Sequence, residues 1–107
     1  PNLQLTVENL TIRDADAEFS GGAMLLHFNS KNIFRNVKFI NNKTSHWNGG
    51  AVKIEGLNEN IFENCEFVGN QCTHTGGAIY SVFSNLSVNN SIFTDNVCTY
   101  AATIEGG

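Results

Sequence analysis

The chain has few charged residues, and basic residues are the scarcest of them. Only 15% of its 107 residues are charged, with 6 Lys and Arg against 10 Asp and Glu, which gives a formal net charge of −4. A nucleic-acid-binding protein needs a stripe of Lys and Arg to meet phosphates. The composition therefore disfavours a nucleic acid as the partner.

Long apolar runs and targeting segments are also missing. The longest apolar run is Ala23–Leu26, which is far too short to span a bilayer. The N-terminus has no basic region followed by an apolar stretch, so it does not resemble a signal peptide. Because the chain does not begin with Met, we expect it to be a processed or excised piece of a longer protein.

What the chain has in abundance is a repeated segment. A Phe-x-x-Asn motif is followed by Gly-Gly-Ala and then Val or Ile, and a later copy keeps Phe and Asn but has Ala101-Ala102 in place of the glycines. A compressed first copy is expected at 19–24. Such self-similarity predicts a repeat protein. The residues that define the repeat are Phe39, Asn42, Gly49, Gly50, Phe67, Asn70, Gly76, Gly77, Phe93 and Asn96.

Each repeat also contains a six-residue unit, with the pattern apolar, polar, Asn or Asp, small or apolar, polar, apolar. We place its copies at 12–17, 34–39, 62–67 and 88–93. Asn and Asp tolerate the left-handed conformation that a sharp corner needs. In stacked copies, their side chains could hydrogen-bond from one copy to the next. The predicted corner column contains Asp14, Asn36, Asn64 and Asn90.

Short apolar–polar alternation without helical spacing predicts an all-β fold. No hairpin turn signal stands between adjacent strands, so each strand should pair with its copy one repeat away. The architecture that fits is a parallel β-helix, a single segment over 1–107 with about four coils of 22–28 residues, at about 9–31, 32–59, 60–84 and 85–107. In this register Arg35 lies over Glu63, which is favourable, but Arg13 lies over Arg35.

The Phe-x-x-Asn and Gly-Gly-Ala-Val or Gly-Gly-Ala-Ile segments resemble the repeat of chlamydial polymorphic outer membrane proteins. They are equally similar to repeats in adhesin-like surface proteins of bacteria and methanogenic archaea. The two full copies lie in 39–52 and 67–79, and the resemblance covers most of the chain. It implies a right-handed β-helix in a secreted or surface-displayed protein, usually one part of a longer rod. It also implies a role in adhesion, with no catalytic residues to transfer.

The three cysteines cannot form a complete disulfide framework, but two of them occupy equivalent loop positions. If the loops stack, Cys72 and Cys98 lie about one rung apart, which is compatible with a disulfide. Two free thiols are the alternative. Cys65 falls in an interior column and is expected to be a small buried hydrophobic residue.

Aromatic and histidine residues on the long loops form a candidate contact surface for a glycan or a protein. Its residues are His46, Trp47, His74 and Tyr100. Packing of each loop against its own coil is the alternative. The histidines could also join Cys72 and Cys98 in a metal cluster, but no tight ligand spacing supports one. We therefore expect no metal and no cofactor.

These features predict a non-catalytic structural or adhesive module of a secreted or cell-surface protein. One alternative is a fragment of a pectate-lyase-like, carbohydrate-active enzyme, but Lys53 stands alone beside Glu55 and no convergent set of acids accompanies it. The other alternative is a subunit of an extracellular fibre, because open β-helix ends expose unpaired strand edges. We expect self-association through these ends, and a protein or glycan partner on another cell.

Overall fold

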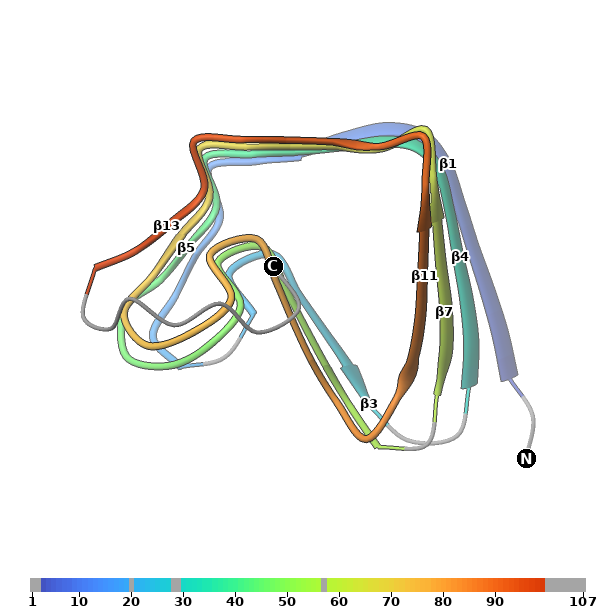
Figure 1. Cartoon of the computed structure of the whole chain (residues 1–107), viewed down its shortest axis with the longest axis horizontal. Coiled ribbons are helices and arrows are strands. Elements are labelled where there is room, and N and C mark those ends of the chain that lie inside the picture. Colours follow the sequence, from blue (N-terminus) through green and yellow to red (C-terminus); the bar gives the residue numbers. More distant parts are fainter. Residues whose placement is uncertain (1–2, 20, 28–29, 57, 100–107) are drawn as a thin grey trace.

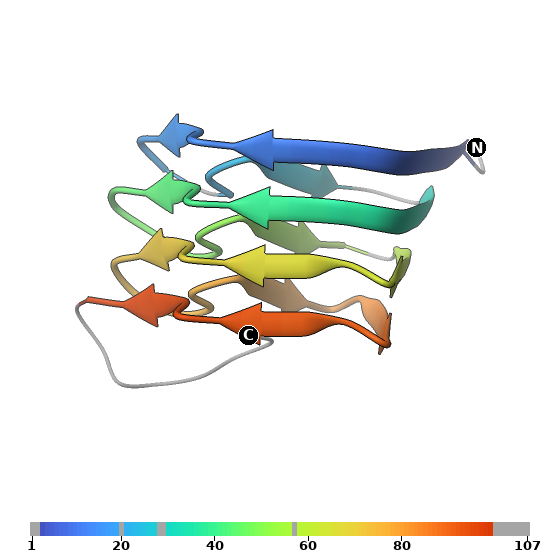
Figure 2. The same cartoon turned by 90° about the horizontal axis from the view of Figure 1, so that it is seen from above.

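The computed structural model describes residues 3–19, 21–27, 30–56 and 58–99. The chain winds in coils that lie almost behind one another in Figure 1 and form a stack of rungs in Figure 2. Every strand pairing between coils is parallel. The described strands complete three turns and two faces of a fourth, slightly fewer than the predicted four coils. The predicted all-β parallel β-helix is confirmed.

Three sheets form the faces of the coil, and the first of them bends over a corner (Figure 1). The first sheet contains β1 (Leu3–Arg13), β4 (Ser30–Ile40), β7 (Glu59–Glu63), β8 (Glu66–Val68), β11 (Asn85–Asn89) and β12 (Ile92–Thr94). The second contains β2 (Asp16–Ala17), β5 (Lys43–Thr44), β9 (Gln71–Cys72) and β13 (Val97–Cys98). The third contains β3 (Met24–His27), β6 (Val52–Glu55) and β10 (Ile79–Val82).

An asparagine column makes the corner within the first sheet. Asn9, Asn36, Asn64 and Asn90 have φ values of 55°, 54°, 53° and 50°, all in the left-handed region. Asn is one of the few residues that adopts this conformation at low cost. Asn36 Nδ2 donates a hydrogen bond to Asn9 Oδ1 at 2.8 Å, which links the first two coils at this corner.

The expectation that Asp14 belongs to this column is wrong. Asp14 has a φ of 58°, but it lies at the following corner, where its N–H donates to Ile40 O at 3.0 Å. Asn41 and Asp95 occupy the same corner in later coils, with φ values of 53° and 56°. The first coil therefore has two left-handed corners, at Asn9 and at Asp14. The sequence pattern placed Asp14, which lies at the second corner, in the column that belongs to the first.

The first copy of the six-residue unit is thus 7–12 rather than 12–17. Val7 pairs with Phe34, and Ile12 pairs with Phe39. Both frames satisfy the pattern, because each contains an Asn or Asp between apolar residues. The observed frame packs Val7 and Ile12 against the core and sets Glu8 beside Arg35. It removes the repulsion that the other frame would create between two arginines.

Stacked phenylalanine rings fill the core along the axis. Phe34 stacks on Phe62 with ring centroids 4.7 Å apart, and Phe39, Phe67 and Phe93 form a second column with spacings of 4.8 and 4.6 Å. These spacings match the distance between paired strands. Rings of neighbouring columns meet edge to face, an arrangement that aromatic pairs prefer. Phenylalanine thus supplies the largest fully buried side chains of the second and third coils.

A ladder of buried asparagines runs beside the second phenylalanine column. The N–H and Nδ2 of Asn42 both donate to Asn70 Oδ1, at 2.9 and 3.0 Å. The N–H and Nδ2 of Asn70 donate in the same way to Asn96 Oδ1, each at 2.9 Å. Asn70 Nδ2 also donates to Phe39 O, and Asn96 Nδ2 to Phe67 O. Each asparagine side chain therefore bonds to main-chain groups of the coil before it, beside the bend between the first and second sheets.

Candidate contact surface on the stacked loops

The loops that follow β5 and β9 lie one above the other and are held in register by hydrogen bonds. Gly49 N–H donates to Thr75 O at 3.0 Å, and His74 N–H donates to Trp47 O at 3.2 Å. Asn48 Oδ1 accepts hydrogen bonds from the N–H and the hydroxyl of Thr75, at 3.2 and 2.9 Å. These contacts fix the spacing of the side chains that the loops carry.

Aromatic and histidine side chains alternate on the outside of these loops and of the loop after β2, which carries Phe19. The ring centroid of Phe19 lies 5.8 Å from that of His46, and Trp47 lies 5.2 Å from His74. Phe19 is 57% exposed and Trp47 is 47% exposed. His46 Nδ1 is 2.9 Å from Glu18 O, which orients the imidazole. We refer to Phe19, His46, Trp47 and His74 as the loop face.

The loop face includes three of the residues suggested by the sequence, and Tyr100 lies outside the described residues. Trp47 packs on the histidine of the following coil and still leaves about half of its surface open. Phe19 was missed, because the sequence pattern assigned it to a compressed repeat. Once the first copy of the unit ends at Ile12, Phe19 falls in the first loop, two residues before Gly21.

The loop face has the chemistry of a recognition surface. Exposed aromatic rings contribute large contact areas and stack on flat or apolar partners. Imidazole nitrogens beside them can donate or accept hydrogen bonds. Phe19 and Trp47 therefore present exposed rings on successive coils.

Two thiols meet on the second sheet, near the loop face. Cys72 and Cys98 are paired residues of β9 and β13, and their Sγ atoms lie 2.8 Å apart as free thiols. The Cys72 thiol also donates to Thr75 O at 3.1 Å. Burial, together with the hydrogen bond to Cys98, raises the pKa of the Cys72 thiol to about 12. The disulfide considered from the sequence is not formed here, although the two residues occupy adjacent rungs.

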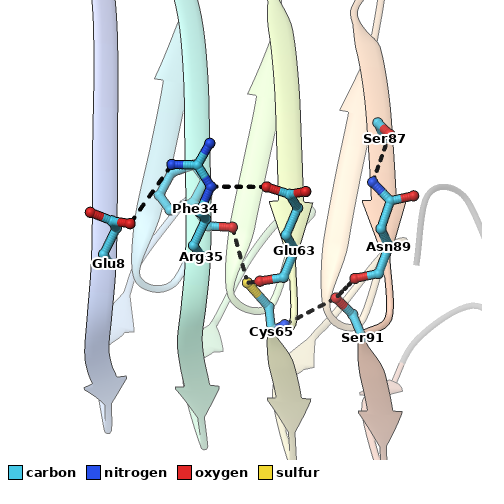
Figure 3. A network of polar contacts seen from close by, with 8 residues as sticks. All are labelled: Glu8, Phe34, Arg35, Glu63, Cys65, Ser87, Asn89 and Ser91. Carbon is cyan, nitrogen blue, oxygen red and sulfur yellow. Dashed lines mark hydrogen bonds and ion pairs between the residues drawn. The ribbon is translucent and has the colours of Figure 1, made fainter.

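Cys65 lies in the interior between the first and second phenylalanine columns. It is 1% exposed, as expected for a buried apolar residue, and burial raises the pKa of its thiol. Its N–H donates to Ser91 Oγ at 3.1 Å, and its thiol donates to Phe34 O at 3.5 Å (Figure 3). Because the thiolate is the reactive form, a protonated and buried thiol such as that of Cys65 is a poor nucleophile.

Charged side chains on the outer face of the first sheet pair across the rungs. Arg35 lies between Glu8 and Glu63, with its Nη1 3.7 Å from Glu8 Oε2 and its Nε 3.0 Å from Glu63 Oε1 (Figure 3). Exposed pairs of this kind each contribute less than about 1 kcal/mol, so they favour the register more than they stabilise the fold. Two further pairs on this face are Lys31–Glu59 at 3.8 Å and Lys38–Glu66 at 3.6 Å.

Within the described ranges, no three His, Cys, Asp or Glu side chains group closely enough to hold a metal ion. The Cys/His cluster considered from the sequence therefore does not form in this part of the chain. The same ranges contain no helix with the length and apolar character needed to cross a bilayer.

The parallel coils, the bent first sheet and the stacked columns define a β-helix. A family model described as a right-handed β-helix region matches residues 3–107. The chain therefore belongs to the right-handed β-helix family. Neither the search of curated proteins nor the search of solved structures finds a match. The family match concerns the fold in general, and a fold by itself does not define an activity.

Proposed function

We propose that this chain is a non-catalytic adhesive module of a secreted or cell-surface β-helix protein, and that the loop face binds a glycan or protein of another cell. The observation that carries the proposal is the pair of exposed rings, Phe19 and Trp47, on successive coils, each beside a histidine. Hydrogen bonds between the loops hold this surface in place before any partner arrives, which lowers the entropy cost of binding.

Many other polar groups of the coils already have structural roles, which favours adhesion over catalysis. Asn70 and Asn96 accept hydrogen bonds from main-chain N–H groups, and acidic residues of the first sheet pair with Lys or Arg. Lys53, the base that a pectate-lyase-like site would need, lies 3.5 Å from Glu55 and 5.8 Å from the ring of Tyr80. A glycosidic or eliminative mechanism requires acids and a base that converge on one bond.

The test is binding of the labelled protein to a glycan array and to intact cells, with and without the Trp47→Ala substitution. We expect the wild-type protein to bind a subset of glycans or a cell-surface protein. Loss of the indole should weaken that binding by about tenfold or more, because aromatic anchors carry much of the energy of such interfaces. The folded state should be retained, since Trp47 is half-exposed.

The matched control is Phe83→Ala. Phe83 is 83% exposed on the turn after β10, so its removal also deletes a surface ring, but outside the loop face. Binding that survives Trp47→Ala and is lost in Phe83→Ala would place the contact surface at the turn after β10 and not on the loop face. Absence of binding to every glycan and every cell type would contradict the adhesive role.

A further inference from the structure

Two cysteines face each other across adjacent rungs of the second sheet. Cys72 in β9 pairs directly with Cys98 in β13, so their Cα atoms lie about 4.8 Å apart, the distance between paired strands. A separation of about 4.8 Å lies within the range found for disulfide-bonded cysteines. Main-chain hydrogen bonds hold the pair on both sides, from Val97 N–H to Asn70 O and from Thr99 N–H to Cys72 O, each at 2.9 Å.

The two side chains also point toward each other. Paired side chains of adjacent parallel strands project from the same face of a sheet, and Cys72 is completely buried on the inner face. The two Sγ atoms lie 2.8 Å apart, so a movement of about 0.8 Å brings them to the length of a disulfide bond, about 2.05 Å. Joining the sulfur atoms therefore requires no rearrangement of the main chain.

The hydrogen bond that the Cys72 thiol makes does not require a cysteine. The thiol donates to Thr75 O at 3.1 Å. Thr44 holds the corresponding position of the second coil, where its hydroxyl donates to Gly49 O at 2.7 Å. A hydroxyl is a stronger donor than a thiol. A covalent bond between the third and fourth coils is the role in this column that only the two thiols can perform.

We propose that Cys72 and Cys98 form a redox clamp, in which a disulfide fastens the fourth coil to the third next to the loop face. The proposed location outside a cell is an oxidising environment, where disulfides persist, but the pairing itself does not depend on that location. Cys65 takes no part, because it lies between β7 and β8, where its N–H donates to Ser91 Oγ and its thiol to Phe34 O. The connectivity of the clamp is therefore unique.

Glutathione disulfide is a suitable oxidant for this pair. One cysteine loses its proton, and its thiolate attacks a sulfur of glutathione disulfide, which forms a mixed disulfide and releases one glutathione. The second cysteine attacks the protein sulfur of the mixed disulfide, and the second glutathione leaves. Both protons end on glutathione, and two electrons pass from the protein to the oxidant. Burial, together with the hydrogen bond to Cys98, raises the pKa of the Cys72 thiol to about 12, so the reaction is run at about pH 8.5.

The test is to equilibrate the reduced protein with glutathione disulfide, alkylate the remaining thiols in urea and determine the mass of the chain. We expect one alkyl group per chain, on Cys65, against three for the protein kept in dithiothreitol. A peptide map should contain Cys72 joined to Cys98. Three alkyl groups after oxidation, a disulfide that uses Cys65, or a disulfide between two chains would each overturn the proposal.

The clamp should also stabilise the fold. A disulfide that closes a segment of this length lowers the unfolding equilibrium constant by about 100-fold or more, so the oxidised protein should unfold at a higher urea concentration than the reduced protein. Cys98→Ser should remove this difference between oxidising and reducing conditions. Equal urea midpoints of the oxidised and reduced wild-type protein would contradict the clamp.

The matched control is Cys65→Val, which also removes one thiol but leaves the pair intact. Val37 holds the corresponding position of the preceding coil, since Lys38 pairs with Glu66. Cys65→Val should therefore keep the full difference between oxidised and reduced midpoints, and loss of that difference would count against the assigned pair. Both readouts, mass and stability, are independent of glycan or cell binding.

Discussion

Replacing Gly50 with alanine is expected to remove a large part of the free energy of unfolding. A Cβ at this position would collide with Gly77 O and lie 2.6 Å from Gln71 N, both main-chain atoms of the following coil. Neither atom can move without breaking the parallel pairing around it. We expect a loss of more than about 4 kcal/mol, against a total stability of roughly 5–15 kcal/mol for a domain of this size. Far-UV circular dichroism and urea denaturation measure the effect.

The matched control is Gly69→Asn. Gly69 has a φ of 66°, and its added Cβ would meet only the side-chain oxygen of Asn41, which can rotate away. Asp14, Asn41 and Asp95 hold the same corner of other coils in the same left-handed conformation. We therefore expect a change below about 1 kcal/mol, within the range of ordinary surface substitutions. A Gly50→Ala protein as stable as this control would show that the coils are not packed as closely as the structure has them.

Asn70→Leu is the second substitution with a large expected effect. Asn70 is completely buried, and its side chain serves Asn42 N–H and Phe39 O. Leucine fills a similar volume but leaves Asn42 N–H buried without an acceptor, and it removes the amide donor to Phe39 O and the side-chain bonds to Asn42 and Asn96. At about 1–3 kcal/mol for the orphaned N–H and about 1 kcal/mol for the other lost hydrogen bonds, we expect a loss of roughly 2–4 kcal/mol, seen as a lower urea midpoint with an unchanged slope.

The control for this substitution is the double variant Asn32→Leu with Asn60→Leu. These two asparagines are also buried, and Asn32 Nδ2 donates to Asn60 Oδ1 at 2.8 Å. Their column already contains leucine in the first and fourth coils, at Leu5 and Leu86. Replacing both partners of a buried pair by apolar groups is nearly neutral, and the further bonds of this pair, to Asn85 O and Ser30 Oγ, are only partly buried, so we expect a change within about 1.5 kcal/mol. Equal losses in the two variants would mean that the ladder at Asn70 has no special role.

Much of the fold is predictable because the coil repeats its own chemistry. Phe39 and Phe67 recur with the same neighbours, and identical side chains in a parallel stack come to lie one over the other. The first coil was misread because a pattern of apolar residues two apart, interrupted by Asn or Asp, fits both 7–12 and 12–17. The arginine mismatch, Arg13 over Arg35, was the one signal in the sequence against the second frame, and the three-dimensional register, with Glu8 beside Arg35, decides for the first.

The candidate site was predictable only in part. Trp47 and His74 were singled out because they precede glycine pairs in long loops, where side chains tend to be exposed. Their contact with each other depends on the stacking of two loops, which the sequence alone does not define. The ladder of Asn42 and Asn70 was missed for a related reason. An asparagine at a bend can serve as a left-handed corner or as a buried carboxamide, and its spacing is similar in both cases.

Amide hydrogen exchange is the most direct measurement of the central claim, that each coil is held by the carboxamide of the coil that follows it. Asn42 and Asn70 donate their N–H groups to buried side-chain oxygens, whereas no described residue accepts from Asn96 N–H. We predict that Asn42 and Asn70 exchange at least about 100-fold more slowly than Asn96, because they open only with the coils themselves. Rapid exchange at Asn42 and Asn70, or equal protection of all three amides, would contradict this account.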